Sequence, residues 1–291
     1  LRRLKQRLGD RPKFALLVHH LKRNEQVPPV VKPLITALEK RLIASSDGLI
    51  VNSTSTLSEV KKIQGVHLPV AVARPSGKRF PEKPRAEQIG PPPTHNEFRI
   101  LFVGNITPRK GLHSLVEALA AIVHAEDQSV SVTTARHATI TAVGATDVDR
   151  RYVANLRRRI RRLGITDRVQ FTGAVSDSTL RAIYENHDIL CVPSQFEGFG
   201  IVYLEAMGFG MPAIGSLGGG ASDIIQDGEN GFLVASGDTR ALAERITRLR
   251  DDSQLCTRMS EAAAATYETS PTWDESMGTI ERFLIELSLI P

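Results

Sequence analysis

Short runs of consecutive apolar residues alternate with helix-length segments over most of this chain. The clearest apolar runs lie at residues 99–104, 138–144, 168–173, 188–194, 211–216 and 231–234. Helical patterns fill the intervals, among them 112–124, 150–162 and 178–187. Strands that are apolar at successive positions are buried on both faces, and helices of this length connect neighbouring parallel strands. The alternation therefore predicts an α/β fold with a parallel sheet covered by helices on both faces.

A shorter part of the same kind comes first in the chain. Residues 14–18 and 47–52 are predicted to be buried strands. Between them, apolar residues recur at helical spacing at Leu34, Leu38 and Leu42. A Thr56-x-x-Glu59 capping box predicts the start of the next helix. Two such Rossmann-like units would hold a ligand between them, beyond the carboxyl ends of their strands.

The proline content marks the boundary between the two parts. Residues 74–98 contain six prolines and few apolar residues, which is typical of a linker. We therefore predict a partial N-terminal domain at 1–80, a linker at 81–97 and a C-terminal domain at 98–271. The last segment, 272–291, is predicted to be an amphipathic helix that returns towards the N-terminal domain. Its apolar positions are Trp273, Met277, Ile280, Leu284 and Leu287.

Charge and composition narrow the classes of partner. The 291 residues carry a formal net charge of +5, with arginine clusters at 2–11 and 150–162. Such clusters attract anions, which include nucleic acids, lipid headgroups and phosphorylated substrates. Apart from Tyr152, no aromatic residue interleaves the arginines to stack on bases, so nucleic acid is disfavoured. Two distant cysteines and the lack of a membrane-spanning apolar run favour a cytoplasmic protein, and the absence of an initiator Met suggests a fragment.

A glycine-bounded loop follows the strand at 99–104. It reads GNITPRKG, from Gly104 to Gly111, and places Arg109 and Lys110 at the start of a helix. The free N–H groups and the dipole of a helix start already favour an anion there. The spacing is neither that of a P-loop nor that of the G-x-G-x-x-G dinucleotide motif. The loop predicts a phosphate-binding site.

The stretch EGFGIVYLE, residues 197–205, carries two carboxylates in an apolar setting. An unpaired buried carboxylate is costly, so Glu197 and Glu205 need polar partners. The glycines at 198 and 200 let backbone N–H groups approach a ligand closely. Carboxylates accept hydrogen bonds from sugar hydroxyls. A ligand with two polyhydroxy ends and an anionic middle, namely a nucleotide sugar, would satisfy both glutamates and the cations.

These motifs, with A-M-x-x-G-x-P and D-G-x-N-G-x-L-V further on, resemble those of the family 4 retaining glycosyltransferases, which have the GT-B fold. The resemblance covers about residues 14–270. It implies two Rossmann-like domains that face a cleft, with the N-terminal one on the acceptor side and incomplete here. It also implies transfer of a sugar from a nucleotide-diphosphate sugar to an acceptor.

The resemblance assigns the donor-binding residues. Arg109 and Lys110 would hold the diphosphate, Glu197 would contact the transferred sugar, and Glu205 would hold the ribose. Further substrate contacts would come from the loops at Gly104, Asn105, Val175, Gly198, Phe199, Gly200 and Ile201. Asn105 departs from the pattern, because many members have Arg there; Arg109 could supply the missing guanidinium. The loop around Val175 would cradle the base.

The resemblance also implies the chemistry. Retention means attack on the front face, with the departing phosphate taking the proton of the acceptor. Glu197, Lys110, Arg109 and a cleft-edge histidine would form the catalytic set, and His19 is favoured over His20. With cations stabilising the diphosphate, neither a metal nor another cofactor is required. Asp147-Val148-Asp149 is interpreted as a polar turn or a helix cap, not as a metal-binding D-x-D motif.

Alternatives to an active transferase stay open at this stage. One is a truncated module that binds a nucleotide sugar without transferring it. Another is a different enzyme of the same architecture, such as a phosphorylase or an epimerase. The sequence identifies neither base, sugar nor acceptor, but its basic clusters favour a lipid-linked or anionic acceptor and a peripheral contact with the membrane.

Overall fold

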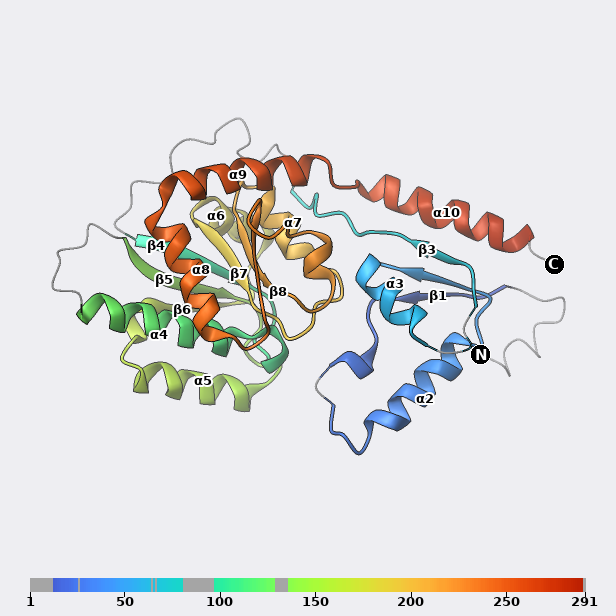
Figure 1. Cartoon of the computed structure of the whole chain (residues 1–291), viewed down its shortest axis with the longest axis horizontal. Coiled ribbons are helices and arrows are strands. Elements are labelled where there is room, and N and C mark those ends of the chain that lie inside the picture. The colour runs from blue at the N-terminus through green and yellow to red at the C-terminus, as the bar shows by residue number, and fades with distance from the viewer. Residues whose placement is uncertain are drawn as a thin grey trace.

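The computed structural model describes residues 13–25, 27–63, 65, 67–80, 97–128 and 136–289. In the N-terminal part, β1 (Ala15–Val18), β2 (Gly48–Val51) and β3 (Val70–Val72) form a parallel sheet in that order. The helices α2 (Lys32–Ile43) and α3 (Thr54–Lys61) connect these strands. Figure 1 shows this part beside a larger second domain.

The described C-terminal part forms a parallel sheet with the order β6-β5-β4-β7-β8-β9. Its strands are β4 (Glu97–Val103), β5 (His137–Val143), β6 (Val169–Gly173), β7 (Ile189–Val192), β8 (Ala213–Ser216) and β9 (Gly231–Val234). Its helices are α4 (Leu112–Gln128), α5 (Arg150–Arg162), α6 (Asp177–Glu185), α7 (Ile201–Met207), α8 (Thr239–Asp251) and α9 (Ser253–Glu268). The predicted α/β fold with parallel sheets is confirmed.

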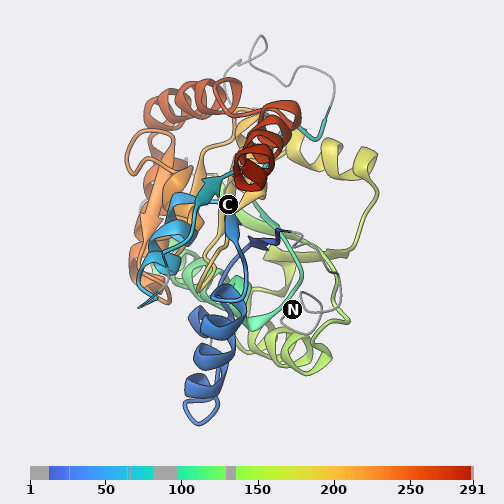
Figure 2. The ribbon, with the colours of Figure 1, turned by 90° about the vertical axis from the view of Figure 1, so that its right-hand side faces the viewer.

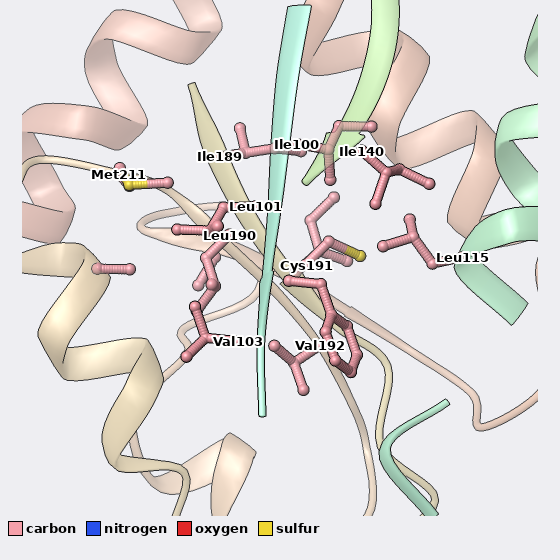
Figure 3. Close-up of a cluster of buried hydrophobic side chains, with 14 of the residues drawn as sticks. Ile100, Leu101, Val103, Leu115, Ile140, Ile189, Leu190, Cys191, Val192 and Met211 are labelled. Carbon is pink, nitrogen blue, oxygen red and sulfur yellow. The ribbon is translucent and has the colours of Figure 1, made fainter. Parts of the chain in front are cut away.

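The centre of this sheet is a buried apolar core. Ile100 and Leu101 of β4 pair in register with Ile189 and Leu190 of β7, and all four are fully buried. Figure 3 shows these side chains pointing to both faces of the sheet, together with Cys191. Burial raises the pKa of the Cys191 thiol, so this cysteine is a packing residue and not a nucleophile.

The strand order fixes where a ligand can bind. The chain moves outward from β4 to β5 and β6, then returns to the other side of β4 with β7. Strand order reverses at this point, and in open α/β sheets ligands bind beyond the carboxyl ends of the strands at such a reversal. The GNITPRKG loop follows β4 and the EGFG loop follows β7. The two motifs therefore meet although they are far apart in the sequence.

The last helix, α10 (Trp273–Leu289), lies along the N-terminal sheet (Figure 1). Phe283 and Leu287 pack with Ile50 and Ala73 of that domain. The prediction of which α10 residues face inward was partly wrong, because Trp273, Met277 and Leu284 are exposed. The helix presents the side chains at 276, 280, 283 and 287 to the sheet instead, about one sixth of a turn away.

Three other local expectations change. The α3 cap is Ser53, not Thr56: the Thr56 N–H donates to the Ser53 hydroxyl at 2.9 Å, so Thr56 lies inside the first turn. Strand β3 was not predicted from the sequence. The predicted helix at Leu34, Leu38 and Leu42 forms as α2, but these leucines are exposed, and α2 projects from the molecule in both Figure 1 and Figure 2.

The segment 76–80, placed by the sequence at the end of the N-terminal domain, packs on the C-terminal domain. Phe80 belongs to the C-terminal core and contacts the rings of Tyr184 and Phe209. Gly77 lies against α7 so closely that a Cβ there would be 2.3 Å from the Cβ of Leu204. The crossover between the domains is therefore anchored on the helix that carries Glu205.

Candidate active site

The loops after β4 and β7 are joined by side-chain and backbone contacts. The Lys110 ammonium lies 2.7 Å from Oε2 of Glu197, and the Ser194 hydroxyl donates to the same oxygen at 3.1 Å. Both charged side chains are mostly buried, at 13% and 12% exposure. An ion pair buried to this degree is stable only if its geometry is good and if further hydrogen bonds satisfy its charged groups. The Ser194 hydroxyl supplies one such bond, so two donors orient the Glu197 carboxylate.

Arg109 has a different partner from Lys110. Its guanidinium donates to the carbonyl oxygen of Phe196 at 2.9 Å, and its own carbonyl accepts from the Gln195 N–H at 2.8 Å. Arg109 thus ties the first loop to the residue before Glu197. The structure brings Arg109, Lys110 and Glu197 together, as the sequence predicted, while Asn105 is exposed beside them.

Two glycines shape the EGFG loop. Gly200 has a φ of 94°, a left-handed conformation that residues other than glycine rarely adopt, and it is the N-cap residue directly before α7. Gly198 lies against the N-terminal domain, where a Cβ would be 2.7 Å from the His19 carbonyl oxygen. The Ser53 hydroxyl also donates to the Gly198 carbonyl at 2.9 Å. The loop is therefore in contact with both domains.

A second contact joins the domains close by. The Asp223 carboxylate accepts from the N–H and the hydroxyl of Thr54, at 2.6 and 2.7 Å, and from the Ser55 N–H at 3.3 Å. These donors lie in the first turn of α3, where unpaired N–H groups and the helix dipole favour a carboxylate. Asp223 therefore fixes α3 beside the EGFG loop.

Glu205 belongs to a separate polar network. It is 4% exposed, and its Oε2 accepts from the Tyr184 hydroxyl at 2.9 Å. Arg79, from the segment between the domains, lies 3.5 Å from its Oε1 and forms a second ion pair with Asp177 at 2.6 Å. Burial raises the pKa of Glu205, and the hydrogen bond from Tyr184 and the charge of Arg79 only partly offset this effect.

The raised pKa of Glu205 predicts a pH-dependent stability. Glu205→Gln mimics the protonated acid, so parent and variant should differ least in free energy of unfolding below the ordinary carboxyl pKa. As the pH rises through the folded pKa, the parent must ionise a buried group and loses this stability, whereas the variant does not. Denaturant unfolding across this pH range should therefore show that the free energy of unfolding of Glu205→Gln rises relative to that of the parent. A constant or shrinking difference would contradict the burial assigned to Glu205.

The predicted histidine lies at the expected edge, but its neighbour has the defined contacts. His19 is exposed. The ring of His20 lies 6.3 Å from that of Phe196, and its Nε2 is 2.8 Å from Glu25. The preference for His19 stays a prediction.

The remaining predicted residues lie on neighbouring loops. Gly104 directly follows β4 with a φ of 148°, and a Cβ there would be 3.4 Å from Cε of Lys110. Val175 is half-buried in the loop between β6 and α6. Phe199 is buried, and Ile201 is the first residue of α7. Asp149 caps α5 by accepting from the Tyr152 N–H, as predicted.

Sequence reasoning missed Arg79, Tyr184, Ser194 and Asp223. Tyr184 carried a usable signal, because it lies at a buried position of a predicted helix and its hydroxyl therefore needs a partner. Arg79 lies in a proline-rich segment, where its charge suggests only solvent exposure. No local pattern pairs either residue with Glu205.

The described residues contain no group of three or more His, Cys, Asp or Glu side chains placed to hold a metal ion. Among them, no helix is both long enough and apolar enough to span a lipid bilayer.

The chain is similar in sequence to curated glycosyltransferases. A D-inositol 3-phosphate glycosyltransferase of Catenulispora acidiphila is 31% identical over 226 residues, which cover 73% of this chain and 50% of the relative. One from Thermomonospora curvata is 28% identical over 267 residues, covering 87% and 59%. The chain thus spans about half the length of the curated relatives it matches.

Solved structures share the fold. Sucrose-phosphate synthase from Thermosynechococcus elongatus superposes with a TM-score of 0.78 at 25% identity, covering 97% of this chain and 70% of that one. Anabaena HepE, solved in complex with UDP-glucose, gives a TM-score of 0.72 at 23% identity, covering 95% and 72%. Residues 85–266 match the family described as Glycosyl transferases group 1. The chain belongs to this family of GT-B glycosyltransferases.

Proposed function

We propose that the chain transfers a sugar, with retention and without a metal, from a nucleotide-diphosphate sugar to an acceptor. The observation that carries this proposal is the joined pair of loops at the reversal of strand order, with Lys110 and Glu197 in contact and nearly buried. A structural neighbour solved with UDP-glucose supports the class of donor. The family membership supports the reaction class.

The proposed mechanism is mainly electrostatic. Negative charge grows on the diphosphate as the bond to the sugar breaks, and Lys110 and Arg109 lie on the loop that would hold it. Before donor binds, Glu197 neutralises Lys110 at 2.7 Å. A bound diphosphate would share the ammonium and free one carboxylate oxygen of Glu197 for a sugar hydroxyl. Cations and hydrogen-bond donors that are already fixed in a partly buried site need little reorganisation as this charge develops.

The other roles are proposals of the same kind. Glu205 would hold the ribose, the backbone of Gly198 to Ile201 would support the diphosphate, and the Val175 loop would cradle the base. His19 would lie beside the reacting sugar. The acceptor is proposed to be anionic or lipid-linked, which is supported by the basic α5 and by relatives named D-inositol 3-phosphate glycosyltransferases. A cytoplasmic, membrane-peripheral location fits such an acceptor.

A panel of nucleotide sugars tests the proposal. We expect one of them to raise the thermal unfolding temperature of the chain, and Glu205→Ala to weaken this effect. Transfer to acceptors or to water is then assayed with the stabilising donor. Stabilisation without any nucleotide release would favour a binding module over a transferase. A ligand that stabilises the parent and Glu205→Ala equally would contradict the assignment of the site.

Tyr184→Phe should raise the KM for the donor by about tenfold to a hundredfold with little change in kcat, because a hydrogen bond to a charged group contributes about 1.5 to 3 kcal/mol. Without the hydroxyl, Glu205 is less firmly positioned and its pKa rises further, so the acid limb of the KM profile should move to higher pH. Tyr203→Phe is the matched control, since its buried hydroxyl donates to the Val192 carbonyl at 2.7 Å. Equal changes in both variants would mean that Tyr184 is only structural.

A further inference from the structure

A groove on the C-terminal domain lies outside the loops described so far. It has a volume of about 1050 Å³ and runs between the first turn of α4 and the length of α5. The residues that matter for its chemistry are His113, Tyr152, Arg158, Arg159, Arg161 and Arg162. It is open to solvent, so a ligand could enter without a rearrangement of the fold.

The groove is strongly cationic. No Asp or Glu is among its lining residues in the described part of the chain. Arg159 is neutralised by Glu117 at 2.6 Å, and Arg158 donates to the Asn155 side chain at 2.5 Å. Within residues 136–289 and the other described ranges, no carboxylate pairs with Arg161 or Arg162. Two guanidinium groups therefore remain available to a ligand.

This charge carries a cost for the helix. Arg158 lies three and four residues before Arg161 and Arg162, so their side chains are neighbours on the helix surface. Like charges at these spacings destabilise a helix by a few tenths of a kcal/mol per pair, roughly the size of a favourable pair. An anion bound in the groove would relieve this repulsion.

The groove begins at the rim of the candidate active site. Pro108 and Gln195 line its near end. Pro108 directly precedes Arg109, Gln195 lies two residues before Glu197, and the two loops are joined at this point by the Gln195 N–H to Arg109 carbonyl bond. A ligand in the groove could therefore extend to the donor loops.

We propose that this groove binds phosphate groups, and that it does so for an acceptor that reaches the donor loops along α5. The planar guanidinium forms paired hydrogen bonds with phosphate oxygens, a geometry that an ammonium cannot supply. The assignment to the acceptor rests on the proposed function, whereas the binding of phosphate does not. The phosphate can be that of a lipid headgroup or of a soluble substrate, and both present the same oxygens.

The test compares variants matched in charge. The groove variant is Arg161→Gln with Arg162→Gln, and the control is Arg240→Gln with Arg258→Gln, two exposed arginines on α8 and α9. Sedimentation with phosphatidylcholine vesicles, with and without phosphatidylglycerol, measures binding to lipid phosphate without any donor. The groove variant should bind the anionic vesicles about thirtyfold more weakly than the parent, from roughly fivefold for each arginine. The control should bind as the parent does.

Inorganic phosphate distinguishes the two sources. Phosphate is added to the parent protein bound to anionic vesicles, and the release it causes is compared with that caused by chloride at the same ionic strength. This comparison is needed because salt alone weakens such contacts. Release by phosphate but not by chloride would show that the groove takes a free phosphate group. Equal release by both would assign the groove to the charged lipid surface.

Equal binding of the groove and control variants, or no binding by the parent, would overturn the proposal. A parent that binds but transfers no sugar would refute the proposed function and leave the groove intact.

Discussion

Replacing Lys110 with alanine should lower kcat/KM for sugar transfer by about a hundredfold to a thousandfold. Loss of one preorganised group that stabilises developing negative charge costs about 2.7 to 4 kcal/mol. Lys110 is the cation in direct contact with Glu197, so its removal also leaves that carboxylate buried without its partner. Initial rates at varied donor concentration measure the effect, which should fall on kcat as well as on KM.

A second lysine provides the matched control. Lys62 forms a pair with Glu59 at 2.5 Å, but its side chain is 68% exposed. An exposed pair of this kind contributes little, about 0 to 1 kcal/mol. Lys62→Ala should therefore keep nearly full activity. A Lys110→Ala variant as active as Lys62→Ala would show that the diphosphate is held elsewhere.

Gly111→Ala should have the largest effect on stability, a loss of about 3 kcal/mol. Gly111 ends the turn that carries Lys110 and has a φ of 75°, which a residue with a Cβ adopts at a cost of about 1 to 2 kcal/mol. A Cβ there would also lie 2.0 Å from the Pro193 carbonyl oxygen, so the two loops would have to move apart. Chemical denaturation measures the loss, and transfer activity should fall with it.

Gly237→Ala separates strain from crowding. Gly237 has a φ of 81°, close to that of Gly111, but a Cβ there would meet no atom within 4 Å. Gly237→Ala should lower the free energy of unfolding only by the cost of the left-handed backbone conformation, about 1 kcal/mol. If both alanine variants lost the same stability, the close approach of the two loops would not matter energetically.

The C-terminal fold was predictable because its strands are apolar at successive positions. Such runs fit only a sheet buried on both faces, and the buried residues of β4 and β7 fulfil this pattern. The N-terminal part was harder. Strand β3 spans only Val70–Val72 and lies between prolines, so its signal was weak. On α10, residues at helical spacing on two adjacent stripes are apolar, and the sequence cannot say which stripe faces the sheet.

The candidate site was predictable as far as local motifs reach. Lys110 and Glu197 each follow a strand within a recognisable loop, and the reversal of strand order brings them together. The partners of Glu205 were not predictable, since Arg79 and Tyr184 lie on other elements and meet it only through packing. The choice between His19 and His20 also depends on ring orientation, which a strand register alone does not determine.

The most direct test is hydrogen exchange of the whole chain with and without a nucleotide sugar, starting with UDP-glucose and using the member of the panel that stabilises most. Binding between the loops after β4 and β7 should slow exchange in residues 104–111 and 194–205 together. Protection confined to other segments, with both of these loops exchanging as fast as in the free protein, would contradict a donor site held by Lys110, Glu197 and Glu205.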